Sequence, residues 1–571
     1  MLTFSISKQI KKRNSITTLS AALLMAFVTL LNSFPTMSQT MPSWIWAYKA
    51  GDMGSDYGNS LCTDTAGNTY VTGTFEQSVY FSIYQLTSAG SEDIFIMKND
   101  DEGNTIWAKS FGGTSLDYVN KITLDNEGNI IITGAFRSDE ITFGTTTLIN
   151  PNSDIGYDNI FVAKFNAEGD NLWAISVDGD GNGTGSGVAT DNNENIIISG
   201  FFDGQVLTFG DIVIHNSFQL TDEIFLAKLD KSGNTLWAKA MGGFGYDYGR
   251  DVAVKNNGDI LLSADFESDS VLMADTTLYN TGGADYFIAD FTPEGNLSWL
   301  NKADGDADEF GTAITSDADD NTYVTGHFNG TAMTIGNTTL PGNGYDNIFV
   351  AKYTPDGQVE WVLNPSGANN DEATGINACP NGMLYVTGEY SSETFTIGAI
   401  ELQNSTTNEY TDTFIAGIKQ DDGSVSWAKS IGGNDDDGIE AVSSDSHGTI
   451  YITGYFYSRI VEIGINVLRN ADDSQNSTDI LYARIDDFDG INNTSSDYDA
   501  VFYPNPATEN IVIKVKNPTT VEIFNNLGQS VLKTEKAETN TSIALAKLQP
   551  GIYFIKFKNK SGVITNKLIK N

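Results

Sequence analysis

The 571-residue sequence is poor in several residue types, and each shortage excludes a class of protein. Cys62 and Cys379 are the only cysteines, too few for a disulfide-stapled scaffold or a cysteine-rich metal domain. The histidines, His215, His327 and His447, are far apart in sequence, and no H-E-x-x-H, G-x-S-x-G, C-x-x-C or phosphate-loop pattern occurs. Long runs rich in Ala, Leu, Glu and Lys are also missing. The sequence therefore favours β-structure and carries few signs of catalysis.

Basic side chains are scarce as well. Residues 39–495 carry 18 Lys and Arg against 68 Asp and Glu, a net charge of −50, whereas residues 496–571 carry 10 against 6, a net charge of +4. Nucleic acids and anionic lipids bind to cationic surfaces, so neither is an expected partner. The acidic part is compatible with cations, basic partners or neutral glycans.

The N-terminus has the features of an export signal. Basic residues precede an apolar run, Leu19 to Leu31, that is shorter than the about 20 residues needed to span a bilayer. We expect a signal peptide at residues 1–38 with cleavage before Gln39, and no transmembrane segment elsewhere. The mature protein is expected to be a monomer outside the cytoplasm.

The glycine-rich, aromatic-rich remainder is a repeat. Each of the seven copies has a tryptophan and, 29 residues later, a second aromatic residue. The tryptophans are Trp46, Trp107, Trp173, Trp237, Trp299, Trp361 and Trp427, and the second aromatics are Phe75, Phe136, Phe202, Phe266, Phe328, Tyr390 and Phe456. A constant internal distance with insertions outside it indicates a repeat architecture.

Each copy predicts four strands joined by D-x-x-G-N turns, as in residues 120–125, 129–136, 158–165 and 234–240, with a small FG-x-x-x-L loop after the second strand. Repeated four-stranded antiparallel units indicate a β-propeller. The last copy lacks a Trp-bearing strand, and the N-terminal segment 44–50 (WIWAYKA) supplies one that would close the ring. Cys62 and Cys379 then lie in separate blades, so both thiols are expected to be free.

The repeat GGTSLDYVNKITLDNEGNIIITGAF (112–136), together with DNIFVAKF (158–165), resembles the seven-bladed β-propeller repeat family called SBBP. The resemblance covers about residues 44–487 and implies a fold more than an activity, because that family has no single function.

The tail has motifs of its own. After an acidic linker at residues 487–500, strands alternate apolar and basic residues, which predicts a small Ig-like β-sandwich at residues 501–571. YPNP (503–506), NLGQ (526–529), LQPGIYFIKF (548–557) and KLIK (567–570) resemble the C-terminal sorting domain of the type IX secretion system. The resemblance implies that the type IX machinery is a partner and that the protein is secreted or placed on the outer cell surface, exported through the periplasm. The predicted fold class is therefore all-β, a seven-bladed propeller at residues 39–486 followed by this sandwich.

One face of the propeller carries the short D-x-x-G-N turns, and the other carries longer, variable, acidic loops. The variable face is the better candidate for binding. The residue before the second aromatic differs in every copy, and Asp265, His327 and Glu389 there form the candidate ligand-binding set. The position ten residues after each tryptophan is acidic in six copies; its recurrence favours a loop-fixing role over a ring of ligand-binding carboxylates. These positions are Asp56, Asp117, Gly183, Asp247, Glu309, Asp371 and Asp437.

The segment VDGDGNGTG (177–185) resembles the start of a calcium loop, D-x-D-x-N-G. Asp178, Asp180, Asn182 and the Thr184 carbonyl are the candidate ligands, and calcium is the one candidate cofactor. The closing bidentate acid is missing, because the twelfth position is Ala189. A glycine-rich variant turn is the favoured interpretation.

The sequence thus favours a non-catalytic binding or adhesion module with an extracellular glycan or protein as ligand. A secreted carbohydrate-active enzyme is one alternative, because paired carboxylates are abundant. A structural component of the cell envelope is the other.

Overall fold

The computed structural model describes residues 42–486, except 217, 219–220, 274–275, 407–409, 446–447 and 473–475, and residues 500–570, except 504–507, 516–518, 526–529, 539–540 and 560–561. The chain divides into two compact parts, and residues 41–487 form the larger one. The predicted signal peptide and nearly all of the predicted linker lie outside the described residues, as do most of the YPNP motif and the whole NLGQ motif.

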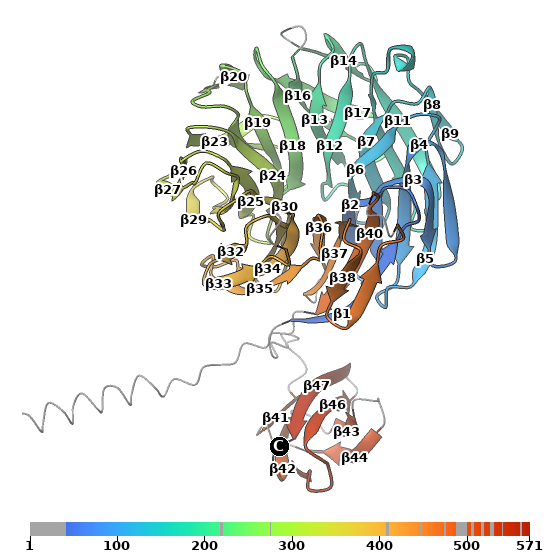
Figure 1. The fold of residues 1–571 in the computed structure, drawn as a ribbon, viewed down its shortest axis with the longest axis vertical. Helices are drawn as coiled ribbons and strands as arrows, with labels where there is room; N and C mark the ends of the chain where they lie inside the picture. Colours follow the sequence, from blue (N-terminus) through green and yellow to red (C-terminus); the bar gives the residue numbers. More distant parts are fainter. Residues whose placement is uncertain are drawn as a thin grey trace, which may run out of the picture. The chain divides into compact units, whose positions relative to one another are not determined.

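The larger part is a ring of four-stranded antiparallel units, the arrangement of a β-propeller (Figure 1). The described residues contain seven such units, two of them extended to six strands by a neighbouring hairpin, and they are numbered here in chain order. Unit 1 comprises β2 (Asp56–Thr63), β3 (Thr69–Phe81), β4 (Tyr84–Asn99) and β5 (Thr105–Phe111). Unit 2 comprises β6 (Asp117–Leu124), β7 (Ile130–Phe136), β10 (Asn159–Phe165) and β11 (Asn171–Gly179). Unit 3 comprises β12 (Gly183–Thr190), β13 (Ile196–Phe202), β16 (Glu223–Leu229) and β17 (Thr235–Met241).

The next four units repeat this order. Unit 4 comprises β18 (Asp247–Val254), β19 (Ile260–Phe266), β22 (Asp285–Phe291) and β23 (Leu297–Gly305). Unit 5 comprises β24 (Glu309–Ser316), β25 (Thr322–Phe328), β28 (Asn347–Tyr353) and β29 (Val359–Leu363). Unit 6 comprises β30 (Asp371–Ala378), β31 (Met383–Tyr390), β34 (Asp412–Lys419) and β35 (Val425–Ile431). Unit 7 comprises β36 (Asp437–Ser444), β37 (Thr449–Phe456), β40 (Asp479–Asp486) and β1 (Ser43–Ala50).

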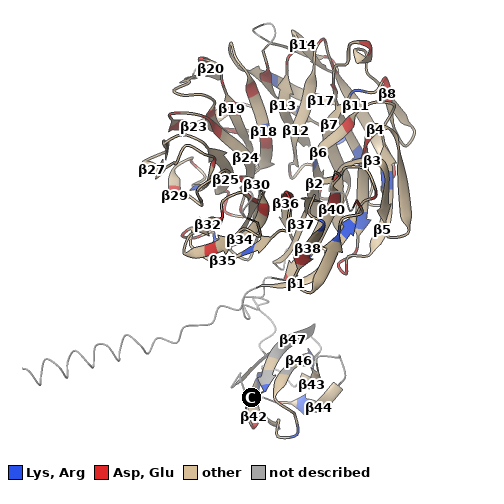
Figure 2. Ribbon diagram, viewed as in Figure 1, with Lys and Arg blue, Asp and Glu red and all other residues tan. Residues whose placement is uncertain are grey.

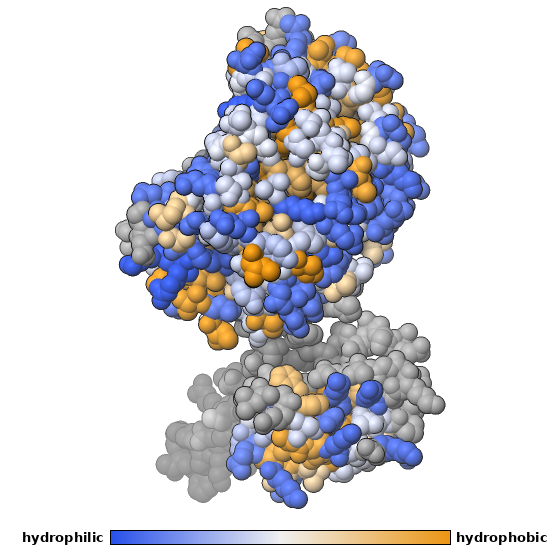
Figure 3. Space-filling view, turned by 90° about the vertical axis from the view of Figure 1, so that its right-hand side faces the viewer, coloured by the Kyte–Doolittle hydropathy of each residue, from blue (hydrophilic) through white to orange (hydrophobic). Residues whose placement is uncertain are grey.

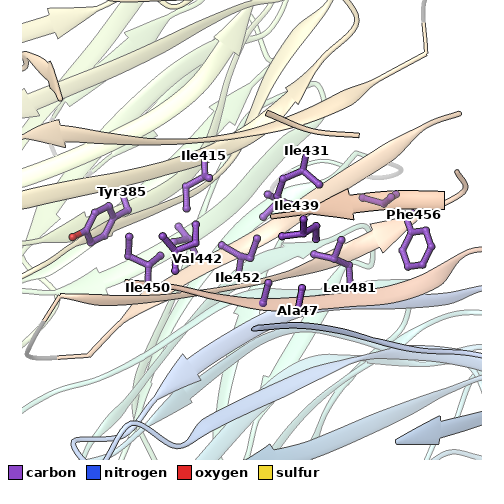
Figure 4. Packing of buried hydrophobic residues seen from close by; sticks show 14 of the residues in the cluster. Ala47, Tyr385, Ile415, Ile431, Ile439, Val442, Ile450, Ile452, Phe456 and Leu481 are labelled. Atoms are coloured by element: carbon purple, nitrogen blue, oxygen red, sulfur yellow. The ribbon is translucent and has the colours of Figure 1, made fainter. Parts of the chain in front are cut away.

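The two ends of the ring meet in unit 7. β1 pairs antiparallel with β40, so the N-terminal segment 44–50 supplies the outer strand of the last unit. Ala47 of β1 and Leu481 of β40 lie in one apolar layer with Ile431 of unit 6 and with Ile439 and Ile452 of unit 7 (Figure 4). The innermost strands contact their neighbours all round the ring, with β36 against β2.

The FG-x-x-x-L segments differ from the predicted small loops, because six units form a two-stranded hairpin there. The hairpins are β8 (Glu140–Phe143) with β9 (Thr146–Ile149), β14 (Val206–Phe209) with β15 (Ile212–His215), β20 (Ser270–Met273) with β21 (Thr276–Tyr279), β26 (Ala332–Ile335) with β27 (Thr338–Pro341), β32 (Thr394–Ile397) with β33 (Ile400–Gln403), and β38 (Ile460–Ile463) with β39 (Asn466–Arg469). In unit 1 the long strands β3 and β4 form the hairpin themselves. A 3-10 turn, Ser153–Ile155, follows β9. Apolar residues of each hairpin are buried, as Ile141 and Phe143 are, which explains the Phe and Leu of the motif.

Tryptophans of the outer strands link neighbouring units. Six indole N–H groups donate to a turn carbonyl of the next unit, at 3.1–3.3 Å. The pairs are Trp46 to Asp101, Trp107 to Ala167, Trp173 to Lys231, Trp237 to Pro293, Trp299 to Pro355 and Trp361 to Gln420. The glycine of each contacted turn lies against the indole ring; a Cβ on Gly169 would come within 2.8 Å of Trp107. Trp46 of β1 therefore makes across the ring closure the same contact that the other five make.

The smaller part consists of two antiparallel sheets. Its strands are β41 (Ala500–Tyr503), β42 (Asn510–Val515), β43 (Thr519–Asn525), β44 (Ser530–Ala537), β45 (Thr541–Ala544), β46 (Gly551–Asn559) and β47 (Gly562–Lys570). One sheet has the order β41-β42-β45 and the other β44-β43-β46-β47. Ile511, Ile513, Ile523 and Phe557 belong to one apolar cluster shared by both sheets.

Charge and hydropathy follow this architecture. Acidic residues are spread around the ring (Figure 2). The side that carries β3, β4 and β9 is mainly hydrophilic with scattered apolar side chains (Figure 3). No helix among the described residues is long and apolar enough to cross a membrane. Within the described chain, Cys62 and Cys379 form no disulfide.

A pair of glycine substitutions in unit 2 tests the contact between units. Gly128 and Gly169 both have positive φ (79° and 74°), but a Cβ on Gly128 would meet nothing within 4 Å. Gly128→Ala should therefore cost only the about 1–2 kcal/mol of a left-handed alanine. Gly169→Ala should cost about 1–3 kcal/mol more, because the new methyl group overlaps Trp107. Chemical denaturation of both variants measures the difference, and equal losses would contradict the role assigned to the contact.

Candidate functional site

The inner strands carry the residues that distinguish one unit from another. In all seven units the pairing of the inner strand with the second strand shifts at one residue, a β-bulge. The bulged positions are Asn59, Asn120, Ser186, Arg250, Thr312, Thr374 and Glu440, and all are half-buried. A bulge re-aims the side chain that it carries and is common beside functional sites.

Two further positions lie at the same end of these strands. The second residue of each inner strand pairs with the residue before the marker aromatic. The pairs are Tyr57–Thr74, Tyr118–Ala135, Thr184–Phe201, Tyr248–Asp265, Phe310–His327, Glu372–Glu389 and Gly438–Tyr455. We call these pairs and the seven bulged residues the inner rim; the innermost strands surround the centre of the ring (Figure 1).

Aromatic residues dominate one stretch of the inner rim. Phe201 of unit 3 meets Tyr248 of unit 4 edge-on, with ring centroids 4.8 Å apart. Phe310 lies 5.3 Å from the ring of His327. The Arg250 guanidinium lies 4.7 Å above Tyr248 and 5.8 Å from Phe310, so it joins these rings in one cation–π group.

Asp265 and His327 lie near this arginine, in adjacent units. Arg250 binds the buried Asp265 carboxylate with both Nε and Nη2, at 2.5 and 3.0 Å. Burial nevertheless raises the pKa of Asp265 to about 6, although Arg250 lowers it. Burial lowers the pKa of His327 to about 4, and the charge of Arg250 adds to this, so the imidazole is neutral at pH 7.

Glu389 belongs to a different group, on units 6 and 7. Its carboxylate accepts a hydrogen bond from the Tyr455 hydroxyl at 3.2 Å. Burial raises its pKa to about 8, and the neighbouring Glu440 and Glu372 raise it further. The structure thus links Asp265 with His327 through Arg250 and places Glu389 with other glutamates.

Sequence reasoning missed the residues that surround these three. Arg250, Glu440 and, apart from Thr184, the second residues of the inner strands were not singled out, although each second residue directly follows the recurrent position. The two-residue alternation of a strand would have identified the second residue. When the acid at the first position is buried on one face of the sheet, the next side chain lies on the opposite face. The bulge has no comparable sequence signal.

Four of the recurrent acids, Asp117, Asp247, Asp371 and Asp437, fix loops by accepting a hydrogen bond from the hydroxyl of the serine 21 residues further on, the role that their recurrence favours. Asp117 is fully buried and accepts hydrogen bonds from the Gly113 amide and from the Ser138 amide and hydroxyl. Asp247 makes the same contacts with Gly243 and Ser268. Each of these acids is the first residue of an inner strand and so lies within the sheet.

The proposed calcium residues have protein partners. Asp178 lies in β11 and accepts hydrogen bonds from Asn159 and Ser176, while Asp180 accepts one from the Val206 amide. The Thr184 hydroxyl lies 3.0 Å from that of Tyr118. Within the described residues, no group of three or more His, Cys, Asp or Glu side chains is placed to hold a metal. Calcium binding through Asp178, Asp180, Asn182 and Thr184 stays a prediction that calorimetry with calcium can test.

Unit 5 explains the D-x-D-x-N pattern without a metal. Asn182 pairs with Asp203 through its amide and side chain, at 2.6 and 2.8 Å. The equivalent pair is Asp308 with Asn329, at 3.0 and 3.1 Å, with the acid and the amide exchanged. In both copies the preceding strand is extended by Asp-Gly and pairs with the hairpin of the next unit, β11 with β14 and β23 with β26.

This exchange predicts a double-mutant result. Asn182→Asp should destabilise the protein, because two carboxylates then face each other. Adding Asp203→Asn recreates the arrangement of unit 5 and should restore stability, with a coupling energy of about 1–3 kcal/mol in a thermal or chemical unfolding cycle. Additive losses would contradict the pairing.

The buried strand-initial acids predict how stability depends on pH. Burial raises the pKa of Asp56 and Asp437 to about 8 and that of Asp371 to about 7. Above pH 4 the folded chain therefore holds protons that the unfolded chain has lost, so stability should fall as pH rises from 5.5 to 8.

The melting temperature across this range measures the effect. Asp437→Asn should flatten the slope, because it removes one titrating group. Asp422→Asn is the control: Asp422 is exposed and hydrogen bonds to Ser424 lower its pKa, so it is ionised throughout. A melting temperature that rises with pH would contradict the assignment.

Comparisons with known proteins agree with the export route. Residues 501–571 match the family model of the secretion system C-terminal sorting domain. The fold and this tail define an exported β-propeller protein that is secreted or held at the cell surface.

Curated relatives are longer than this chain. An uncharacterized WD repeat-containing protein of Acanthamoeba polyphaga mimivirus is 24% identical over 449 residues, 64% of this chain and 32% of its own length. The regulatory protein FlaEY of Caulobacter vibrioides is 22% identical over 365 residues, 61% of this chain and 37% of its own length. This chain thus spans about a third of the length of either relative.

Solved structures include other β-proteins at low identity. The WD40 domain of Neurospora crassa Pan2 aligns with 75% of this chain and 89% of its own, at 8% identity and a TM-score of 0.38. Quinohemoprotein alcohol dehydrogenase from Comamonas testosteroni aligns with 78% of this chain and 76% of its own, at 9% identity and a TM-score of 0.36. The fold assignment rests on the strand order described above.

Proposed function

We propose that the protein is an exported binding or adhesion module whose ligand contacts the inner rim. The observation that carries the proposal is a contrast within the chain. The strands, turns and tryptophans repeat from unit to unit, whereas the cross-strand rim position holds seven different residue types. At this position Thr74, Ala135 and Asp265 are buried, and Phe201, His327, Glu389 and Tyr455 are half-buried. A repeated scaffold that carries varied side chains is the usual form of a binding site on a rigid frame.

The composition of the inner rim supports this role. Tyrosine, phenylalanine and histidine rings beside carboxyl groups provide flat apolar faces and hydrogen-bonding groups in one place. The face with the D-x-x-G-N turns has fewer side chains available to a ligand, because its Asp side chains make hydrogen bonds within the turns. Asp125, for example, accepts hydrogen bonds from the backbone amides of Glu127 and Asn129.

The domain organisation completes the proposal. We assign residues 39–486 to a seven-bladed propeller of the SBBP type, residues 487–500 to a linker and residues 501–571 to an Ig-like type IX sorting domain that the secretion machinery handles. Strand 44–50 closes the ring, and residues 1–38 act as the signal peptide of a monomeric mature protein.

A matched pair of aromatic variants tests the binding role. Tyr248 belongs to the inner rim, whereas Tyr279 is 67% exposed on hairpin β20–β21. Glycan arrays and binding to extracellular protein preparations should show loss of signal, by about tenfold or more, for Tyr248→Ala and none for Tyr279→Ala. Full binding by the Tyr248 variant together with a normal melting temperature would exclude this site.

A further inference from the structure

Three glutamates of units 6 and 7 form a group of like charges at the inner rim. Glu372 and Glu389 are cross-strand partners in unit 6, and Glu440 is the bulged residue of unit 7. Loss of hydration raises the pKa of Glu440 to about 7, and the charge of Glu372 adds to it. No Lys or Arg is among the main influences on the pKa of Glu389 or Glu440, and Glu440 makes no hydrogen bond to any described residue.

Three tyrosines adjoin one another beside Glu389. Tyr455 donates a hydrogen bond to Glu389, and its ring meets that of Tyr57 edge-on at 5.2 Å. The hydroxyls of Tyr57 and Tyr457 lie 3.1 Å apart. Gly438 leaves the space that this packing needs, because a Cβ there would lie 2.3 Å from Glu389 and 2.5 Å from the Tyr455 ring.

Unit 4 shows what the equivalent positions hold when a cation is present. Arg250 occupies the bulged position that Glu440 occupies in unit 7, and Tyr248 is the counterpart of Tyr57. The guanidinium lies over Tyr248 and is bound by Asp265, whose position corresponds to that of Glu389. Around the three glutamates the corresponding positions come from three units, Glu389 from unit 6, Glu440 from unit 7 and Tyr57 from unit 1, and no described Lys or Arg is among the main influences on the pKa of either glutamate.

We propose that Glu372, Glu389, Glu440, Tyr57, Tyr455 and Tyr457, the acidic cage, bind a guanidinium or primary ammonium group supplied by the ligand. The proposal rests on the proposed function and adds the chemical class of the ligand. A cation in the cage pairs with carboxylates that otherwise repel one another and lies against tyrosine rings, two interactions that a partly dehydrated site strengthens. The propeller's strong negative charge raises the local concentration of such ligands.

Cation binding in the cage is coupled to proton release. The charges of Glu440, Glu372 and Asp436 raise the pKa of Glu389, the hydrogen bond from Tyr455 lowers it, and no basic group is among the main influences on it. Below pH 7 part of this set is protonated, and a bound cation favours the ionised form. Affinity should therefore rise from pH 6 to pH 8, with protons released on binding.

Calorimetry on the full mature chain tests the proposal with three probes. Agmatine represents a free guanidinium compound, N-acetyl-Gly-Arg-Gly represents an arginine side chain, and N-acetyl-Gly-citrulline-Gly, which has neither a charged side chain nor a free amino terminus, is the match of the latter. Binding of either guanidinium probe with no binding of the citrulline peptide is expected, and the preferred probe shows whether the ligand is a small amine or a peptide.

Glu440→Gln and Glu389→Gln should each weaken binding by about tenfold or more, and Glu140→Gln, a change of the same charge on an exposed residue of β8, should not. A normal melting temperature of the Glu440 variant would show that its weaker binding is not caused by a loss of folding. No binding of either guanidinium probe at millimolar concentration, equal binding of the citrulline peptide, or unchanged binding by both glutamine variants would overturn the proposal. Loss of array binding in the Tyr248 variant would still support the proposed function in that case.

Discussion

The contact between an outer-strand tryptophan and the turn of the next unit is the interaction on which the ring depends. A four-stranded sheet has two faces, and both must be covered by neighbouring sheets for the core to be excluded from water. At the outer edge the indole covers the next unit: its ring packs on the glycine of the turn, and its N–H group donates a hydrogen bond to a turn carbonyl. Because Trp46 of β1 makes this contact with unit 1, the chain ends join through the same chemistry as every other junction.

At the junction between units 6 and 7 the paired strands β40 and β1 come from distant parts of the chain. Trp427 is fully buried there and lies against Gly417 of its own unit. The apolar layer that includes Ala47, Ile431 and Leu481 lies at this junction (Figure 4). The ring is therefore closed by burial of apolar surface as well as by strand pairing.

Several polar interactions are retained among the units although the residues that make them are exchanged. Lys164 pairs with Asp125 and Lys228 with Asp191, each at a buried turn. In unit 4 the charges are reversed, with Lys255 on the turn and Asp290 on the strand, 2.8 Å apart and almost fully buried. The Asn182–Asp203 and Asp308–Asn329 pairs show the same exchange. Each buried polar group needs a partner, and either orientation of the pair provides one.

Much of the fold was predictable from the sequence, because the spacing of tryptophans, aromatics and D-x-x-G-N turns reflects local constraints: strand length, positive φ at glycine and side-chain hydrogen bonds within a turn. The sequence alone also indicated the spare N-terminal strand and the sorting tail. It could not show the bulge in every inner strand, because a bulge arises from pairing between strands and has no fixed residue type. For the same reason Asp265 and His327 could be chosen by position, but Arg250 and Glu440 could not. Only the packing of one unit against the next decides which side chains meet at the inner rim and whether a buried carboxylate finds a cation there.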